Sequence, residues 1–258
     1  MKMTRKEFLK LSGACLVVLS GGEAATVFEG ADRNETRATS ARRAAKQWAM
    51  LIDTAKCAKD KGCTNCIEAC AGAHNIPSIP DSAHEVKWIW EERFENVFDS
   101  YQTQYMAEAR KQQLTPVLCN HCDDPPCVRV CPTDATWKRE DDGLVMMDWH
   151  RCIGCRYCMA ACPYGSRSFN WIDPRPYIKH LNPDFPTRTK GVVEKCDFCA
   201  ERLAKGRQPA CVEACPEKAL LFGDVKDQKS EIRQVLASAN TLRRKPELGT
   251  GPNVYYDL

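Results

Sequence analysis

The sequence predicts an α+β protein built from a repeated unit, in which a strand enters a cysteine-rich loop and a short helix follows the loop. Sixteen of its 17 cysteines fall into four groups of four, and Cys15 stands alone. The groups consist of Cys57, Cys63, Cys66 and Cys70; Cys119, Cys122, Cys127 and Cys131; Cys152, Cys155, Cys158 and Cys162; and Cys196, Cys199, Cys211 and Cys215. Apolar runs precede three of the groups: WAMLIDTAKC at 48–57, GLVMMDWHRC at 143–152 and TKGVVEKC at 189–196.

The spacing of the cysteines indicates iron–sulfur clusters rather than disulfides or zinc. The third group reads CIGCRYCMAACP, which is the C-x2-C-x2-C-x3-C-P run of bacterial ferredoxins. Disulfide frameworks are typical of short secreted chains and show no preference for C-x2-C, whose cysteines are poorly placed to pair. Zinc sites usually join two C-x2-C pairs across a longer gap and some include histidine, of which the whole chain has only 5.

The spacing also has a mechanical reason. Three closely spaced thiolates can wrap a short loop around one face of a cubane, where backbone amides donate hydrogen bonds to sulfur. We expect the fourth cysteine of a group to begin a helix that leads away from the cluster. Proline follows this cysteine in three groups, at Pro132, Pro163 and Pro216, and proline suits the first turn of a helix.

The first group departs from this pattern, because five residues separate Cys57 from Cys63. Cys57 is therefore either a stray thiol beside a three-iron cluster or a ligand reached through a longer loop. The second and fourth groups also contain irregular gaps, of four and 11 residues between their second and third cysteines. Residues 58–62 are mostly charged and end in Gly62, as expected of a solvent-facing loop. We therefore predict that Cys57 is a ligand.

The gaps between groups predict how the groups pair. Only 20 residues separate the second group from the third, whereas 48 separate the first from the second and 33 the third from the fourth. The short gap is expected inside one two-cluster ferredoxin unit. The prediction is a duplicated bacterial ferredoxin-like fold with loop insertions over residues 46–228, in which an inner unit (115–172) is nested in an outer one. Residues 229–258 are predicted to be an extended C-terminal tail.

The insertion between the first two groups contains HEVKWIWEERFENVF and DSYQTQYMAEARKQQ, a polar and aromatic segment with helical stretches. We expect Trp88, Trp90, Phe94 and Phe98 to pack inside the domain. The alternative is that they form a docking surface for a partner.

The formal net charge of +3 does not describe the loaded protein. A [4Fe-4S] core held by four thiolates carries about two negative charges, so four clusters would leave the protein acidic by about five charges. Arg151, Arg156 and Lys195, which flank cysteines, are therefore interpreted as local counter-charge or solvated surface charge rather than as a nucleic-acid patch. The chain has no phosphate-binding loop and no nucleophile elbow, which favours electron transfer over catalysis.

Residues 1–25 have the features of an export signal: a basic start, an apolar run over 11–19 and a tract of small residues over 22–25. The apolar run is much shorter than the roughly 20 residues that a spanning helix needs. TRKEFLK at 4–10 resembles the twin-arginine consensus, except that Lys6 replaces the second arginine. The alternatives are a signal that is retained as an anchor and an ordinary amphipathic N-terminal helix. Residues 26–45 are predicted to be a linker.

Three segments carry a resemblance to a known family: CNHCDDPPCVRVCPTDAT, DGLVMMDWHRCIGCRYCMAACPYGSRSF and KCDFCAERLAKGRQPACVEACPEKALLFGD. With the first group, they resemble the four-cluster ferredoxin-like subunits of membrane-bound oxidoreductases, which include the electron-transfer subunits of nitrite, dimethyl-sulfoxide, polysulfide and tetrathionate reductases. The resemblance implies that four [4Fe-4S] clusters share ligands between groups. The implied sets are Cys57, Cys63, Cys66 and Cys215; Cys70, Cys196, Cys199 and Cys211; Cys119, Cys122, Cys127 and Cys162; and Cys131, Cys152, Cys155 and Cys158.

The export signal, the C-x5-C-T-N-C-I-E-A-C run and the HNIP after it resemble, more narrowly, the iron–sulfur subunits of the sulfite-reduction-associated membrane complex. This resemblance implies an electron relay at the extracytoplasmic face of the cytoplasmic membrane, between a quinone-reactive integral-membrane subunit and a multihaem cytochrome c. The alternative is the electron-transfer subunit of a molybdopterin reductase. His121, inside C-N-H-C, is expected to lie beside a cluster rather than to ligate it, because four cysteines already complete that site.

Overall fold

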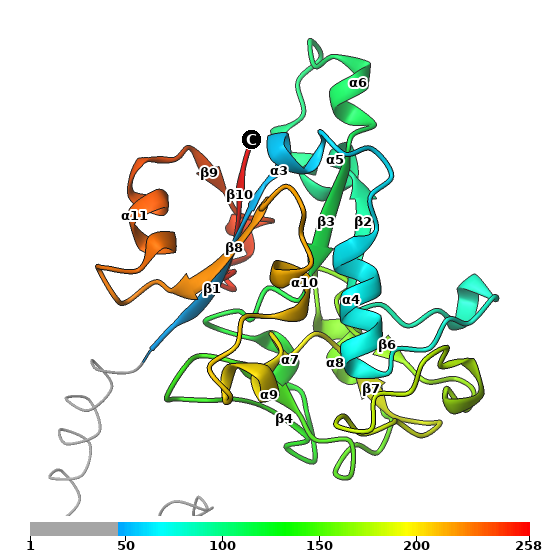
Figure 1. Ribbon diagram of the computed structural model, residues 1–258. Helices are drawn as coiled ribbons and strands as arrows, with labels where there is room; N and C mark the ends of the chain where they lie inside the picture. Colours follow the sequence, from blue (N-terminus) through cyan, green and yellow to red (C-terminus); the bar gives the residue numbers. More distant parts are fainter. Residues whose placement is uncertain (1–45) are drawn as a thin grey trace, which may run out of the picture. The chain divides into compact units, whose positions relative to one another are not determined.

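The computed structural model describes residues 46–258 (Figure 1). The predicted export signal and linker, residues 1–45, lie outside the described residues. The strands of the described part are β1 (Trp48–Asp53), β2 (Ile89–Arg93), β3 (Leu114–Leu118), β4 (Thr136–Lys138), β5 (Val145–Met147), β6 (Ser168–Phe169), β7 (Val193–Glu194), β8 (Leu220–Asp224), β9 (Thr241–Leu242) and β10 (Val254–Asp257). The predicted mixture of helices and strands is confirmed, and the strands expected before the first, third and fourth cysteine groups are β1, β5 and β7.

Most helices of the described part are short. They are α3 (Thr54–Cys57), α4 (Asn65–His74), α5 (Phe94–Val97), α6 (Glu108–Lys111), α7 (Pro126–Arg129), α8 (Tyr157–Ala161), α9 (Ala200–Leu203), α10 (Ala210–Glu213) and α11 (Glu231–Ser238). Single 3-10 turns lie at Ser82–His84, Asp99–Tyr101, Arg175–Tyr177 and Pro246–Leu248. Within residues 46–258, no helix combines the length and the apolar character that crossing a bilayer requires.

The largest sheet joins the two ends of the cysteine-rich region. Its strand order is β8-β1-β10-β9, and β1 pairs antiparallel with β8, with Met50 opposite Phe222. Because β1 enters the first cysteine group and β8 follows the fourth, this pairing is consistent with an outer unit built from those two groups. β1 is apolar on both faces, since Met50 and Ile52 contact the main core while Ala49 and Leu51 pack against α11.

The C-terminal residues are not the extended tail that the sequence predicts. Residues 229–258 form α11, β9 and β10, and β10 pairs parallel with β1 inside the largest sheet (Figure 1). Val254 and Tyr256 on β10 are completely buried. A strand of only four residues gives a weak periodic signal in the sequence. Its apolar side chains are buried because the strand pairs with β1, about 200 residues earlier in the sequence.

The remaining strands of the described part form three two-stranded sheets, β2-β3, β4-β5 and β6-β7. The hairpin of β4 and β5 connects the second cysteine group to the third. The packing role predicted for the insertion is confirmed for Trp88, Phe94 and Phe98, which are at most 2% exposed, whereas Trp90 is only partly buried. The helical stretches expected in the insertion are α5 and α6, whereas the segment around Trp90 is the strand β2, which pairs along its whole length with β3.

In three of the cysteine groups the helix lies before the fourth cysteine, and not after it as the sequence predicts. α7, α8 and α10 end just before Cys131, Cys162 and Cys215, and the proline that follows begins a turn instead of a helix. A proline disfavours helical backbone in the residue before it, which forces the helix to end there; Cys162 has the extended angles φ −81° and ψ 110°. Only α4 continues past the fourth cysteine of its group, because Ala71 follows Cys70.

Candidate iron–sulfur cluster sites

A first cavity, site I, collects thiols from the first and fourth cysteine groups. About 400 Å³ lie between the protein atoms there, part of it open to solvent. Glu91, Pro116 and Leu220 contribute to its wall. The thiols that line it belong to Cys57, Cys63, Cys66 and Cys215.

The structure places Cys57 at site I in spite of its unusual spacing. Cys57 ends α3, whose first turn is capped by the Asp53 carboxylate, which accepts a hydrogen bond of 2.8 Å from the Lys56 amide. Lys59 to Gly62 are exposed, and Gly62 has a φ of +81°, which favours glycine. Burial raises the pKa of the Cys57 thiol to about 11, with further contributions from Cys215 and Glu91. The five intervening residues therefore form a surface loop that leaves Cys57 facing the other three thiols.

Two similar cavities, sites III and IV, join the second and third groups. About 330 Å³ lie between the protein atoms at site III and about 290 Å³ at site IV, part of both open to solvent. The thiols at site III belong to Cys119, Cys122, Cys127 and Cys162. Those at site IV belong to Cys131, Cys152, Cys155 and Cys158. Each cavity takes three thiols from one group and one from the other, so the predicted exchange of the fourth cysteine agrees with the geometry.

Site II is a buried quartet between the outer groups. Burial raises the pKa of the Cys70 thiol well above its ordinary value, and the charges of Cys196, Cys211 and Cys199 raise it further. Such mutual repulsion requires that the four sulfur atoms lie close together in a region of low dielectric. The members of site II are Cys70, Cys196, Cys199 and Cys211, all of them buried.

The donor sets fit [4Fe-4S] clusters. Each site offers four thiols, the full ligand set of a cubane, and backbone amides donate to ligand sulfur as the loop geometry predicts. The amides of Phe198, Ala210 and Ala219 lie 3.4, 3.3 and 3.3 Å from the sulfurs of Cys196, Cys199 and Cys215. Iron would keep the thiols deprotonated and would neutralise the repulsion that raises their pKa values.

Electrostatic influence between thiols of different sites indicates which sites are neighbours. The charge of Cys66 at site I contributes to raising the pKa of Cys211 at site II, where burial is the largest cause. Burial, then the charge of Asp197, and then that of Cys119 at site III raise the pKa of Cys196 at site II. Burial and then Cys127 at site III raise the pKa of Cys158 at site IV, while Arg167 opposes them. Site I is therefore a neighbour of site II, site II of site III, and site III of site IV.

His121 lies between sites II and III and is not placed to ligate a metal. Its Nδ1 accepts a hydrogen bond of 3.0 Å from the Val145 amide, and its Nε2 donates to the Cys196 carbonyl at 3.1 Å. The ring is completely buried and stacks on Phe198. Burial, followed by the charge of Lys195, holds the pKa of His121 well below its usual range. Both ring nitrogens are therefore engaged and the imidazole is neutral, which agrees with the prediction that His121 is not a cluster ligand.

Lys195 is a buried cation beside the same junction. It is 2% exposed, and its ammonium donates to the carbonyl oxygens of Val145 and of Cys196, the latter at 2.7 Å. Of the three basic residues interpreted as counter-charge or surface charge, only Lys195 is buried, whereas Arg151 and Arg156 are exposed. Arg156 nevertheless lines site IV and stacks over the ring of Trp171.

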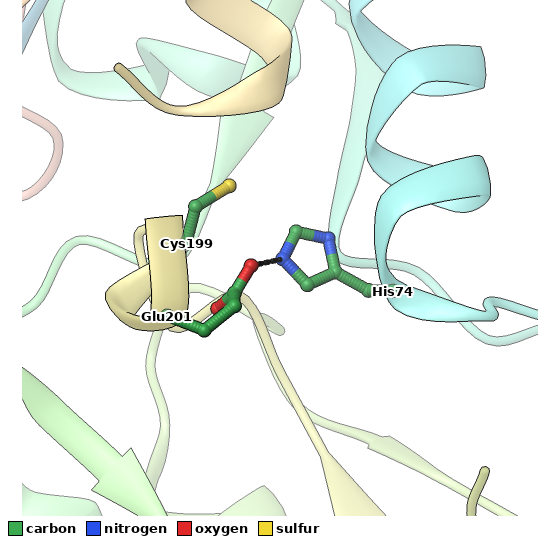
Figure 2. Close-up of side chains that lie close together, drawn as sticks. All are labelled: His74, Cys199 and Glu201. Carbon is green, nitrogen blue, oxygen red and sulfur yellow. Dashed lines mark ion pairs between the residues drawn. The ribbon is translucent and has the colours of Figure 1, made fainter. Parts of the chain in front are cut away.

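A histidine that the sequence did not single out lies against site II. Figure 2 shows His74, from α4, directed towards Glu201 on α9, with Cys199 beside them. His74 Nε2 lies 3.2 Å from the Glu201 carboxylate, and Nδ1 lies 3.6 Å from Cys70 Sγ. Burial alone lowers the pKa of His74, but Glu201 and Asp197 raise it above its ordinary value. Because Cys70 and Cys199 belong to site II, these groups surround that site and do not form a separate metal centre.

The sequence did not indicate that Arg167 lies beside a cysteine site either. The sequence contains 37 lysines and arginines, and nothing in CPYGSRSF distinguishes this one from surface charge. In the structure it is buried against Cys127 at site III. Its position five residues after Cys162, directly before β6, was the only available signal.

Four thiol quartets on short loops, each with another quartet as a neighbour, define an iron–sulfur protein of the electron-transfer class. A family model described as a 4Fe-4S dicluster domain matches residues 110–177 and again 173–225. The two matches together cover the second, third and fourth cysteine groups.

Comparison with known proteins then gives the family. The sequence is 39% identical to Hdr-like menaquinol oxidoreductase iron-sulfur subunit 1 of Archaeoglobus fulgidus, over 98% of this protein and 97% of that one. It is 38% identical to the iron-sulfur cluster-binding subunit of menaquinone reductase of Nitratidesulfovibrio vulgaris, over 81% and 88% of the two proteins. It is 37% identical to the iron-sulfur subunit of arsenate respiratory reductase of a Shewanella species, over 80% and 94%. This protein belongs to the family of iron–sulfur electron-transfer subunits of membrane oxidoreductases, as its motifs predict.

Proposed function

We propose that the chain carries four [4Fe-4S] clusters, one at each of sites I to IV, and relays electrons through them within a membrane-bound respiratory complex. Bound clusters would supply one-electron transfer at each site. The protein contributes the thiol ligands, the amide donors to sulfur and the apolar walls that limit access of water. The observation that carries the proposal is that each quartet has another quartet as a neighbour, I beside II, II beside III and III beside IV, since a relay needs neighbouring carriers.

Sites I and IV differ from site II in exposure. Cys57 and Cys63 at site I, and Cys152 and Cys155 at site IV, are only partly buried, whereas all four thiols of site II are buried. Electrons can therefore enter and leave at sites I and IV, where partners can approach, while site II serves internal transfer. This asymmetry supports a relay between two partners.

The partners that we propose are a quinone-reactive integral-membrane subunit and a multihaem cytochrome c, in a complex of sulfur metabolism at the extracytoplasmic face of the membrane. Support comes from the first segment of the sequence, which has the features of a twin-arginine-like export signal, and from the C-x5-C-T-N-C-I-E-A-C run. The similarity over almost the full length to a subunit named for menaquinol oxidation supports the quinone partner.

A second candidate function is the electron-transfer subunit of a molybdopterin reductase. The similarity to the iron-sulfur subunit of a respiratory reductase, which covers 94% of that protein, favours it. The cysteine sites would be the same in both cases, because only the docking faces for partners differ.

Isolation of the complex from native membranes tests these functions. A preparation with about 16 non-haem iron atoms per chain is expected, since four cubanes require that number. Copurifying c-type haem would support the cytochrome relay and contradict the second candidate, and a molybdopterin subunit without c-type haem would do the reverse. A colourless preparation that contains zinc would contradict both.

A further inference from the structure

Arg167 is a buried cation in direct contact with a thiol of site III. The residue is 4% exposed, and its Nη2 donates hydrogen bonds to Cys127 Sγ at 3.0 Å and to Thr136 Oγ1 at 2.8 Å. Its Nη1 lies 3.7 Å from the sulfur of Met147, a residue that lines site IV. The guanidinium therefore lies at the junction between these two sites.

Within the part of the chain that the structure describes, no carboxylate forms an ion pair with this guanidinium. The charges that raise its pKa against the effect of burial are those of Cys127, Cys158 and Cys119. Arg188 provides the contrast, because it is equally buried but lies 2.7 Å from the Glu194 carboxylate. An unpaired buried charge is strongly unfavourable. The counter-ions of Arg167 must therefore be the thiolates of sites III and IV, together with the clusters that these thiolates would bind.

We propose that Arg167 sets the reduction potential of the cluster at site III, and to a smaller extent that of the cluster at site IV, and makes both easier to reduce. This inference rests on the proposed function, because it requires that both sites hold clusters. Reduction adds one negative charge, which a nearby guanidinium stabilises, and a hydrogen bond to ligand sulfur acts in the same direction. Burial strengthens both effects, since water does not screen them.

Three substitutions separate charge from structure. Arg167→Gln removes the charge and keeps a hydrogen-bond donor, and Arg167→Lys keeps the charge. Arg175→Gln is the matched control, because Arg175 is exposed and paired with Asp173 at 2.6 Å. Each variant is isolated within the complex, its iron is counted, and its clusters are titrated with redox mediators by EPR. The signal of site III is identified as the one altered by Cys122→Ala.

We expect Arg167→Gln to shift the ratio of oxidised to reduced cluster at site III at least tenfold towards the oxidised form, which is about 59 mV for a one-electron couple. Site IV should shift less in the same direction. Arg167→Lys should retain most of the original potential, and Arg175→Gln should leave both potentials unchanged.

The iron count keeps failure of this inference distinct from failure of the proposed function. A protein without clusters would contradict the function itself, whereas full iron with unchanged potentials in Arg167→Gln would overturn only the role of Arg167. Equal shifts in the Gln and Lys variants would also overturn it, because charge would then be irrelevant. If Arg167→Gln loses iron, the Lys variant decides: full loading at the original potential supports a requirement for charge, and loss of iron there shows a purely structural role.

Discussion

Replacement of Glu194 by glutamine should destabilise the protein far more than the same change at the surface. Glu194 is completely buried on β7, two residues before Cys196, and its carboxylate contacts the Arg188 guanidinium at 2.7 Å. It also accepts hydrogen bonds of 2.9 Å from the Trp88 indole and 2.5 Å from the Asn170 amide. Arg188 in turn donates to the carbonyl of Asn75 after α4, so the pair joins the first cysteine group to the fourth around site II.

The magnitude follows from the charge that the substitution leaves behind. Glu194→Gln keeps the shape of the side chain but leaves the Arg188 guanidinium buried without an anion, and breaking such a pair costs about 3–5 kcal/mol. With a denaturant slope of about 4 kcal/mol/M in guanidinium chloride, the unfolding midpoint should fall by about 1 M. The control is Glu213→Gln, whose carboxylate is 42% exposed beside Arg202 and Arg207 and should contribute about 0–1 kcal/mol.

The assay is unfolding of the loaded protein in guanidinium chloride without oxygen, followed by circular dichroism and by the visible absorbance of the clusters. The unfolding midpoint of Glu194→Gln should be lower by both signals, whereas that of Glu213→Gln should be almost unchanged. Equal midpoints for the two variants would refute this expectation, because burial of the ion pair would then have no energetic consequence.

Three further outcomes are expected. Cys57→Ala should convert the cluster at site I to a three-iron form visible by EPR, because only three of the four thiols of that cavity remain; four intact cubanes in this variant would contradict the assignment. Tyr256→Ala should lower the free energy of unfolding in denaturant by about 3–5 kcal/mol, since the ring is fully buried against Phe98. The control, Tyr105→Ala at an 86% exposed position, should change this free energy by less than about 0.5 kcal/mol. Similar losses in the two variants would argue against a structural role of β10. Removal of iron by a chelator should lower the thermal unfolding midpoint measured by calorimetry, because site II would retain four buried thiols without a metal, and an unchanged midpoint would show that iron does not stabilise the fold.

Cys57 shows that local sequence features can predict a ligand even where its spacing is unusual. Its distance from Cys63 violates the usual motif, but the charged residues between them and Gly62 predicted a surface loop, and the structure contains that loop. The prediction failed where two local signals compete. Pro163 is compatible with the first turn of a helix, but its effect on Cys162 ends the preceding helix instead.

The sequence by itself determined the class of cofactor chemistry and the family, because cluster ligands must follow one another at short, nearly fixed spacing, and such spacing is readable along one chain. It also predicted the strands that enter the cysteine groups. Only the tertiary structure decided the roles of β10, Arg167 and the pair of Arg188 with Glu194. Each of these roles depends on residues that the fold brings together. The apolar face of β10 is covered because the strand pairs with β1, far earlier in the sequence. Arg188 has a carboxylate beside it and forms a structural ion pair, whereas Arg167 has a cysteine sulfur beside it and acts as a counter-charge.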